Sequence, residues 1–582
     1  MTLISPIHTE KTECQDCYKC LRNCPTKAIR VEAGRAAVVP ELCIACGICV
    51  GACPVRAKRI RDDLAQVRIW LAEPAPVLVS LAPSFASEFG ALRPGRLIRA
   101  LKRLGFAGVS ETALGAQEIS GAVASRLRGE TRPRLYISSA CPSVVELLTK
   151  HFPEYATALT DLLSPMLAHA RLLRQTFKEP VRIVFIGPCA AKKKEVQRYP
   201  EMVDAALTFA DLRGWLEAEG ICPQSLDIEA DDGFVPRPAR EGGLYPIDGG
   251  MNRNIELRLE PGQAALMTFS GLPAIKRALR ELDPKKLKKH LFLELLACEG
   301  GCVNGPGALA DGGGTILKRQ AVQDYVKPVG QATQTEGGLR LQTFWALDLP
   351  PTAEIDEATL RNHLREVGKF KPSDELNCGG CGYESCRDFA RALAESKAER
   401  TMCVSYMRKL AQSKANALLK TMPSGVVIVD RNLRVVESNR PFAELLGEDA
   451  ATIYQSKPGM EGASLSRLAP ALQPLFSSVL ESGREIIDRD LRFDRRILRA
   501  SLFSVEPHYL VGGVLQDITQ PAVQRGEVIR RAREVINKNL RTVQEIACLL
   551  GENAAESEII LESIVSSFSP ESGERSLPDH LS

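Results

Sequence analysis

The feature of this 582-residue chain that most restricts its fold is a duplicated run of cysteines near the N-terminus. Both runs have the spacing C-x2-C-x2-C-x3-C-P, and they comprise Cys14, Cys17, Cys20, Cys24 and Pro25, and then Cys43, Cys46, Cys49, Cys53 and Pro54. Gaps of two residues allow successive thiolates to face one iron–sulfur centre. Structural zinc sites usually take two separated cysteine pairs, so repeated runs of four favour iron–sulfur clusters over zinc.

In runs of this type the fourth cysteine binds the cluster of the other run. We therefore predict two [4Fe–4S] clusters, the first held by Cys14, Cys17, Cys20 and Cys53 and the second by Cys43, Cys46, Cys49 and Cys24. The pattern is that of a bacterial-type 2x[4Fe–4S] ferredoxin domain, which we place at residues 1–65.

The composition indicates a globular protein of several domains. Hydrophobic residues make up 45% and charged residues 25%, and the length corresponds to about four domains. The net charge of +4 gives no electrostatic reason to expect nucleic acid or a membrane as a partner. Because no apolar run approaches the ~20 residues that a bilayer requires and the start lacks a signal-peptide pattern, we expect a cytoplasmic protein. Two isolated cysteines, Cys222 and Cys548, are expected to be small buried hydrophobic residues.

Between residues 70 and 350, short apolar segments alternate with amphipathic ones. Strands are predicted at 76–81, 134–138, 181–186 and 291–296, and helices at 95–104 and 143–151. This alternation is typical of parallel α/β layers. Three of the strands run directly into loops that contain Cys141, Cys189, and the pair Cys298 and Cys302. Because ligands bind outside the carboxyl ends of parallel strands, we expect these four thiols to converge on one buried cofactor.

The three cysteine loops resemble the three signatures of the catalytic domain of [FeFe]-hydrogenases. Those signatures are T-S-C-C-P, M-P-C-x-x-K-x-x-E and E-x-M-A-C-x-x-G-C, and the chain has Ser-Ser-Ala-Cys-Pro at 138–142, Gly-Pro-Cys-Ala-Ala-Lys-Lys-Lys-Glu at 187–195 and Glu-Leu-Leu-Ala-Cys-Glu-Gly-Gly-Cys at 294–302. The resemblance implies an α/β domain at residues 70–350 that holds an H-cluster, a [4Fe–4S] cubane linked to a two-iron unit with CO and cyanide ligands.

Carried over by position, the resemblance assigns roles to single residues. Four cysteines would bind iron: Cys141, Cys189 and Cys298 the cubane, and Cys302 both the cubane and the two-iron unit. Lys192 would donate a hydrogen bond to a cyanide ligand, and Glu195 would be structural support nearby. An ammonium suits a buried anionic ligand because it supplies both a charge and a donor.

The chain departs from the hydrogenase signatures where protons are transferred. Metabolic hydrogenases have a second cysteine that passes protons to the two-iron unit, and Ala140 stands at that position here. The methionines of the second and third signatures are replaced by Gly187 and Leu296, and residues 119–129, where the family continues the proton path, contain no carboxylate. Rapid turnover requires a titratable group within hydrogen-bond reach of the reacting atom. We therefore predict that any H2:acceptor oxidoreductase activity is slow.

A further cysteine motif lies in residues 356–415. It has the spacing C-x2-C-x4-C-x16-C and consists of Cys378, Cys381, Cys386 and Cys403. The motif resembles a small [4Fe–4S] domain of several redox proteins, and its glycines allow the backbone to wrap tightly around a cluster. Zinc is an open alternative at this motif; we favour a cluster because three other such centres are predicted in the same chain.

Residues 416–522 resemble a PAS domain. From Gly425 onward the sequence predicts a strand, a turn at Asp430, a second strand and a helix capped by Asn439, while residues 509–519 resemble the closing strand. Residues 523–582 are predicted to be a C-terminal helical segment and tail. Apolar residues recur there at gaps of three and four: Ile529, Ala532, Ile536, Leu540, Val543, Ala547 and Leu550. This period is typical of a two-stranded coiled coil, and a helix packed on its own PAS domain is an equally good interpretation.

Together the modules predict a multidomain α/β iron–sulfur protein that resembles the sensory [FeFe]-hydrogenases. The H-cluster would sense H2 or redox state, and the [4Fe–4S] clusters would relay that state to the PAS and helical region. The family suggests a kinase or phosphatase as signalling partner, and ferredoxin is a candidate redox partner. Two alternatives stay open: a catalytic ferredoxin-linked hydrogenase, and a non-catalytic scaffold whose four cysteines hold only a cubane. In the scaffold alternative, Lys192, Lys193 and Lys194 would be a solvated run of charges.

Overall fold

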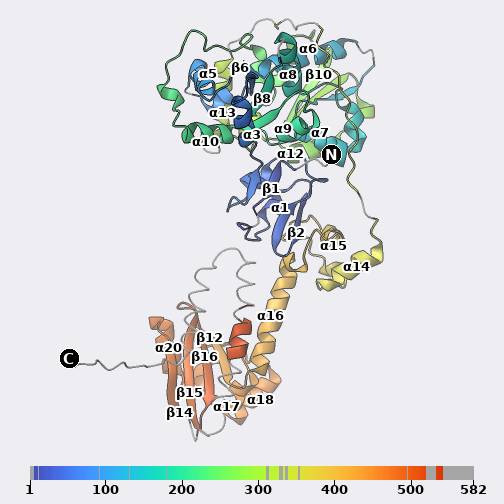
Figure 1. Ribbon diagram of the computed structural model, residues 1–582. Helices are drawn as coiled ribbons and strands as arrows, with labels where there is room; N and C mark the ends of the chain where they lie inside the picture. Colours follow the sequence, from blue (N-terminus) through green and yellow to red (C-terminus); the bar gives the residue numbers. More distant parts are fainter. Residues whose placement is uncertain are drawn as a thin grey trace, which may run out of the picture. The chain divides into compact units, whose positions relative to one another are not determined.

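The chain divides into two compact units, Met1–Glu399 and Arg400–Ser582, each of which we describe by itself. In the computed structural model shown in Figure 1, the residues described are 5–10, 12–90, 92–129, 132–177, 180–309, 314–326, 332–333, 338–351, 354–493, 496–519, 533–539 and 541. No helix within these ranges combines the length and the apolar character needed to cross a membrane.

The first unit begins with a small module built from two antiparallel strand pairs and two short helices. Its elements are β1 (Ile7–Thr9), α1 (Lys19–Asn23), β2 (Ile29–Glu32), β3 (Arg35–Val38), α2 (Ile48–Gly51) and β4 (Lys58–Ile60). Strand β1 pairs with β4, and β2 pairs with β3. Each helix is preceded by a left-handed residue, Tyr18 at φ 56° and Gly47 at φ 79°. The two cysteine runs therefore turn in the same way, as expected of a duplication.

The α/β domain contains two all-parallel sheets. The larger one has the order β6-β5-β8-β9, and the smaller one has the order β10-β11-β7. The strands are β5 (Val77–Leu81), β6 (Gly108–Glu111), β7 (Leu135–Ile137), β8 (Arg182–Gly187), β9 (Ala205–Thr208), β10 (Ala264–Ser270) and β11 (His290–Leu296). Every residue of β5 and β11 is buried, as expected of parallel strands that are covered on both faces. The predicted parallel α/β layers are confirmed.

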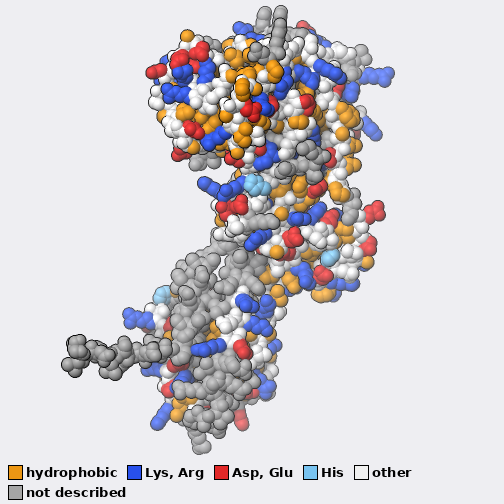
Figure 2. All heavy atoms as spheres, in the orientation of Figure 1, with side chains coloured by type: hydrophobic (Ala, Val, Ile, Leu, Met, Phe, Trp, Pro, Cys, Tyr) orange, Lys and Arg blue, Asp and Glu red, His pale blue; other side chains and the backbone are white. Residues whose placement is uncertain are grey.

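Helices surround the two sheets (Figure 1). They are α3 (Leu64–Leu71), α4 (Phe85–Glu88), α5 (Pro94–Arg103), α6 (Ala113–Gly129), α7 (Pro142–His151), α8 (Pro165–Thr176), α9 (Ala191–Arg198), α10 (Phe209–Ala218), α11 (Gly250–Glu256), α12 (Leu272–Glu281) and α13 (Gly314–Tyr325). Helix α5 shows why the amphipathic pattern is predictive, because it buries Leu97, Ile98 and Leu101 and exposes its polar face. On the face seen in Figure 2, basic and acidic side chains of the α/β domain are interspersed, in keeping with the near balance of charge.

The first unit ends with a small helical module. Helices α14 (Glu357–Glu366) and α15 (Cys386–Ala394) pack together through Leu360, Leu364 and Ala390. Helix α15 begins after Ser385, whose side chain accepts a hydrogen bond from the backbone of Asp388. This cap fixes where the third cysteine of the motif enters the helix.

The second unit contains a five-stranded antiparallel sheet of order β13-β12-β16-β15-β14. Its elements are α16 (Val404–Thr421), β12 (Gly425–Asp430), β13 (Val435–Ser438), α17 (Arg440–Leu446), α18 (Glu448–Ser456), α19 (Leu465–Leu468), α20 (Gln473–Ser482), β14 (Ile486–Phe493), β15 (Arg496–Glu506) and β16 (Leu510–Asp517). As predicted, Asn439 caps α17 by accepting a hydrogen bond from the backbone of Phe442 at 3.0 Å. The predicted closing strand is β16. Of the predicted C-terminal helical segment, residues 533–539 are helical, while Cys548, the tail and most of the apolar seam lie outside the described residues.

Candidate functional site

Four cysteines from three distant loops lie around one cavity in the α/β domain. Cys141 follows β7 and precedes α7, Cys189 follows β8, and Cys298 and Cys302 follow β11. All four line the same cavity, which has a volume of about 110 Å³. A volume of about 10–15 Å³ is enough for one buried water, so this cavity has room for a group of many atoms. The fold thus brings together the four thiols that the sequence placed at strand ends.

Burial disfavours the charged form of three of these thiols, those of Cys189, Cys298 and Cys302. Burial raises the pKa of Cys189 to about 11, with a further increase from the charge of Cys141. Burial raises the pKa values of Cys298 and Cys302 still further, and the neighbouring cysteines add to the effect. A thiolate in such a place needs a compensating cation, which bound iron supplies. A set of four sulfurs around one cavity, with room between them, fits an iron–sulfur group.

Lys192 supplies positive charge at the cavity wall. Its ammonium donates hydrogen bonds to Ser164 Oγ at 2.9 Å and to Glu195 Oε2 at 2.5 Å, and the residue is 8% exposed. Its charge lowers the pKa values of Cys189 and Cys302 against the effect of burial. An ammonium has three N–H donors. Two are used by Ser164 and Glu195, which leaves one for a ligand in the cavity that Lys192 lines.

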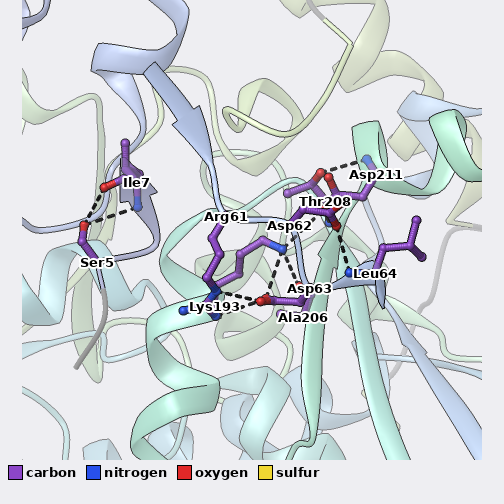
Figure 3. A network of polar contacts seen from close by, with 10 residues as sticks. All are labelled: Ser5, Ile7, Arg61, Asp62, Asp63, Leu64, Lys193, Ala206, Thr208 and Asp211. Atoms are coloured by element: carbon purple, nitrogen blue, oxygen red, sulfur yellow. Dashed lines mark hydrogen bonds and ion pairs between the residues drawn. The ribbon is translucent and has the colours of Figure 1, made fainter. Parts of the chain in front are cut away.

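The other two lysines of the triplet are also buried. Lys193 is fully buried and donates to the carbonyl of Ala206 at 2.7 Å, while its ammonium lies 3.3 Å from carboxylate oxygens of both Asp63 and Asp211 (Figure 3). Lys194 is 9% exposed and pairs with Glu146. The interpretation of the triplet as a solvated run of charges is therefore wrong. Each lysine has its own buried partner because successive residues of α9 point in different directions.

The departures from the hydrogenase signatures lie in the wall of this cavity. Ala140 lines it directly, as does Leu296. A side chain at Gly187 would place its Cβ 2.6 Å from the Phe185 ring and 2.7 Å from Ala82 Cβ, so a methionine has no room there. On α6, Ala116 lines the cavity. The packing around the cavity is therefore complete without the side chains that the signatures would add.

Several polar groups near the cavity were not identified from the sequence. Thr112 lines the cavity and begins a buried chain of hydrogen bonds that runs through Ser80 to the ring of His169 and on to Ser110, with each link 2.8 Å long. Burial lowers the pKa of His169 to about 3, so its ring is neutral. Tyr245 also lines the cavity, and its hydroxyl lies 2.8 Å from Ser120 Oγ. Single serines, threonines and histidines on apolar elements carry no spacing signal, which is why these groups are found only in the structure.

Glu294, the glutamate of the third signature, is another buried group close to the site. Its carboxylate accepts hydrogen bonds from the backbone of Met251 at 3.3 Å, from the backbone of Asn252 at 3.2 Å and from Thr268 Oγ1 at 3.1 Å. Burial raises the pKa of Glu294 to about 7 despite these donors. The carboxyl therefore titrates near neutral pH.

In the N-terminal module, electrostatic interactions group the cysteines into two sets. The charge of Cys24 acts on Cys43, Cys46 and Cys49, whereas Cys20 interacts with Cys14 and Cys17. Burial raises the pKa of Cys46 to about 12 and that of Cys20 to about 11. Cys53, the eighth cysteine of this module, is partly exposed.

The second cysteine run lies against the cavity of the α/β domain. Cys46 is itself part of the cavity wall, and its charge acts on Cys298. The next residue, Gly47, lies so close to Pro306 that a Cβ there would be 2.4 Å from the proline ring. Helix α7 adds a second connection: it starts after Cys141 and ends at His151, whose ring contacts the carbonyl of Leu42 at 3.0 Å. The two cysteine sets are therefore held in a fixed relation.

The later cysteine motif is divided between the two units. In the first unit Cys378 is exposed, whereas Cys381 and Cys386 are buried, and Asn377 Oδ1 accepts a hydrogen bond from the backbone of Cys386 at 2.8 Å. Cys403 belongs to the second unit, directly before α16. Cys222 is exposed, so its predicted burial is wrong; it lies in the turn after α10, where no core covers it. Across the ranges described above, no three His, Cys, Asp or Glu side chains are arranged to hold a single metal ion.

Comparison with known families accounts for these modules one by one. Residues 75–306 match the family described as iron-only hydrogenase large subunit, C-terminal domain. This chain is a hydrogenase-like iron–sulfur protein. Residues 6–54 match a 4Fe-4S dicluster domain, residues 374–405 match a putative Fe-S cluster family, and residues 414–489 match a PAS domain. The family match at 374–405 spans Cys378 to Cys403 and favours a cluster over zinc at this hydrogenase-like protein's last cysteine motif.

Hydrogenases are among the curated proteins to which this hydrogenase-like protein is similar. The periplasmic [Fe] hydrogenase large subunit of Nitratidesulfovibrio vulgaris is 26% identical over 364 residues, which are 52% of this chain and 86% of the relative. The NADP-reducing hydrogenase subunit HndD of Solidesulfovibrio fructosivorans is 24% identical over 351 residues, which are 50% of this chain and 60% of the relative. Among solved structures, an apo [FeFe]-hydrogenase HydA1 from Chlamydomonas reinhardtii is 19% identical with a TM-score of 0.40, covering 49% of this chain and 99% of that one.

Proposed function

We propose that this protein senses H2 at an H-cluster in the cavity and relays the resulting redox state through its [4Fe–4S] clusters to the PAS and C-terminal helical region. The hydrogenase domain match and the two other iron–sulfur family matches support the redox part of this proposal. The PAS match supports the relay, since a PAS domain adds nothing obvious to a purely metabolic enzyme.

In this proposal Cys141, Cys189, Cys298 and Cys302 are the H-cluster ligands. When bound, the H-cluster supplies the site at which H2 is taken up and split. The protein would hold it with four sulfurs that line the cavity and would offer the third N–H of Lys192 to an anionic ligand of the two-iron unit. Glu195 is proposed to orient the ammonium, because the short hydrogen bond between the two side chains fixes it at the cavity wall.

The observation that carries the sensing function is the methyl group of Ala140 in the cavity wall. It has no exchangeable proton, and the adjacent face of α6 presents Ala116. A positioned acid or base contributes ~10²–10⁴-fold to turnover, so a site that lacks one at the position of Ala140 is suited to slow equilibration with H2 rather than to rapid catalysis. A slow site can report the level of a gas without consuming much of it.

The electron route in this proposal starts at Cys46. Because this cysteine forms part of the cavity wall, the centre held by Cys24, Cys43, Cys46 and Cys49 would receive electrons directly from the H-cluster. Lys150 holds the same loop by donating to the carbonyl of Glu41 at 2.8 Å, so the distance between donor and acceptor is fixed.

Two measurements test the proposal on the full, matured chain. Infrared bands of iron-bound CO and cyanide should be present, and their absence would leave the alternative of a cubane-only scaffold. H2 uptake should be slow, and Ala140→Cys should increase it by less than the ~10²–10⁴-fold of a complete proton path, because residues 119–129 contain no carboxylate. Uptake by the unmodified chain at the rate of metabolic hydrogenases would contradict the sensing function and favour a catalytic hydrogenase.

The proposal assigns signal output to the second unit. This unit would bind a kinase or phosphatase and would dimerise through residues 523–582. Measuring the oligomeric state of the chain under H2 and under an oxidant tests this part: a sensing function predicts that the state, or the binding of a kinase or phosphatase, differs between the two conditions.

A further inference from the structure

The hydroxyl of Tyr383 has no hydrogen-bond partner among the described residues, although its side chain is buried. The residue is 6% exposed, and its ring packs on Phe389 with centroids 5.9 Å apart. An unsatisfied buried hydroxyl is unfavourable, so phenylalanine would be the better residue for packing alone. The presence of tyrosine therefore points to an acceptor that the described residues do not provide.

Tyr383 lies where the last cysteine motif meets the N-terminal module. It is two residues from Cys381, and the intervening Gly382 packs so closely on α1 that a Cβ there would be 3.1 Å from Leu21 Cγ. Helix α1 leads directly to Cys24. The charges of both Cys381 and Cys24 act on the Tyr383 hydroxyl, that of Cys381 more strongly. The hydroxyl is therefore within range of two cysteines that belong to different proposed clusters.

The remaining charged neighbour does not compete for this hydroxyl. The charge of Glu395 also acts on it, but Glu395 forms an ion pair with Lys397 at 2.8 Å. On the other side of the junction, Lys276 of α12 donates to the carbonyl of Pro25 at 2.6 Å and interacts electrostatically with Glu384 and Cys24. The backbone of Val31 donates a hydrogen bond to the carbonyl of Lys397 at 2.9 Å, which holds the motif region against the N-terminal module.

We propose that Tyr383 is a positioning residue of the electron path, whose hydroxyl donates a hydrogen bond to a sulfur of the cluster bound by Cys378, Cys381 and Cys386. This inference rests on the proposed function, because it requires that cluster to be present. A donor to a cluster sulfur stabilises the reduced, more negative state and so raises the reduction potential. The higher potential would favour electron transfer to this cluster, which is the one closest in sequence to the second unit.

The test is the Tyr383→Phe variant of the full, matured chain, studied by redox titration with electron paramagnetic resonance. A Cys381→Ser variant first identifies the signal of this cluster by removing it. The midpoint potential of that signal should shift to lower values in Tyr383→Phe, while the signals of the two N-terminal clusters stay unchanged. Tyr509→Phe, at a tyrosine in the PAS unit that is 48% exposed, is the matched control and should leave every potential unchanged.

A second readout uses the iron-free chain. Because the hydroxyl has no partner within the described part of the chain, Tyr383→Phe should unfold at the same temperature as the parent or at a higher one, whereas loss of a structural hydrogen bond would lower that temperature. An unchanged potential of the identified cluster, or a shift confined to the N-terminal clusters, would overturn the role of Tyr383 alone. If Cys381→Ser removed no signal and no iron, the cluster itself would be absent, and the relay of the proposed function would fail with it.

Discussion

The cysteines of residues 14–53 and those around the cavity are placed by different means. In the N-terminal module, left-handed residues such as Tyr18 and Gly47 turn the chain between closely spaced cysteines. Around the cavity, Cys141, Cys189 and Cys298 follow three strands that belong to two separate sheets. The first arrangement depends on local backbone conformation, and the second depends on the correct packing of a whole domain.

This difference has a consequence for how each site responds to mutation. A change in the core of the α/β domain, far from any cysteine, should disturb the cavity and leave the N-terminal clusters intact. If such a change removed the cavity cluster and the N-terminal clusters together, the distinction between local and long-range placement of the cysteines would be wrong. Three variants, in order of decreasing expected effect, put this to the test.

The largest effect is expected for Lys193→Met. The variant removes a fully buried ammonium and its contacts with Asp63, Asp211 and the carbonyl of Ala206. Arg61 still donates to Asp63, and the backbone of Thr208 still donates to Asp211. Removing one partner of a buried ion pair typically costs about 3–5 kcal/mol, and we expect about 4 kcal/mol of unfolding free energy here.

Urea unfolding of the iron-free chain, followed by tryptophan fluorescence, measures this loss, because Trp70, Trp215 and Trp345 all lie in the first unit. Lys409→Met, at an exposed lysine of α16, is the control. It should change the free energy of unfolding by less than about 0.5 kcal/mol. Equal stability of the two variants would show that the buried contacts of Lys193 contribute nothing.

Gly187→Met restores the residue found in the hydrogenase signature and should have the next largest effect. Its side chain would collide with Phe185 and Ala82, and overpacking of this kind costs about 1–3 kcal/mol. We expect iron and the infrared bands of the cavity site to be lost while the resonance signals of the N-terminal clusters persist.

The same substitution at Gly214 is the matched control, since nothing lies within 4 Å of a Cβ built there. This variant should retain the full iron content. Simultaneous loss of all clusters in Gly187→Met would contradict the distinction between local and long-range placement.

The effect expected for Glu294→Gln depends on pH and is the smallest of the three within any single pH unit. The folded chain raises the pKa of Glu294 from 4.5 to about 7, so between these values the folded state keeps a proton that the unfolded state has released. Raising the pH through this window therefore lowers the stability of the parent relative to the variant, by about 1.4 kcal/mol per pH unit. Below pH 4.5 and above pH 7 the difference should be constant.

Urea unfolding of the iron-free parent and variant at several pH values between 5 and 7 measures this difference, with Glu281→Gln at an exposed position as the control. A difference between parent and Glu294→Gln that does not change with pH would show that Glu294 does not titrate in this range.

The same distinction explains what could be predicted from the sequence. The cysteine runs, the strands that end at Cys141, Cys189 and Cys298, and the cap at Asn439 each depend on residues close together in the chain, and each was recognisable. The buried chain from Thr112 to His169 and the contact of Gly47 with Pro306 depend on tertiary packing, which leaves no periodic signal. The burial of three consecutive lysines was not recognisable, since charged residues are usually exposed. Partners that allow this burial lie on other elements.

Those three lysines also set the rotation of α9 about its own axis. Lys192 meets Ser164, Lys193 meets Asp63 and Asp211, and Lys194 meets Glu146, and all of these partners lie outside α9. Successive residues of a helix are turned by about 100°, so a slip of one residue would present every ammonium to the wrong neighbour at once. The helix can therefore take only one rotation about its axis. The contacts of Lys193 and Lys194, which do not line this cavity, thus keep Lys192 at the cavity wall.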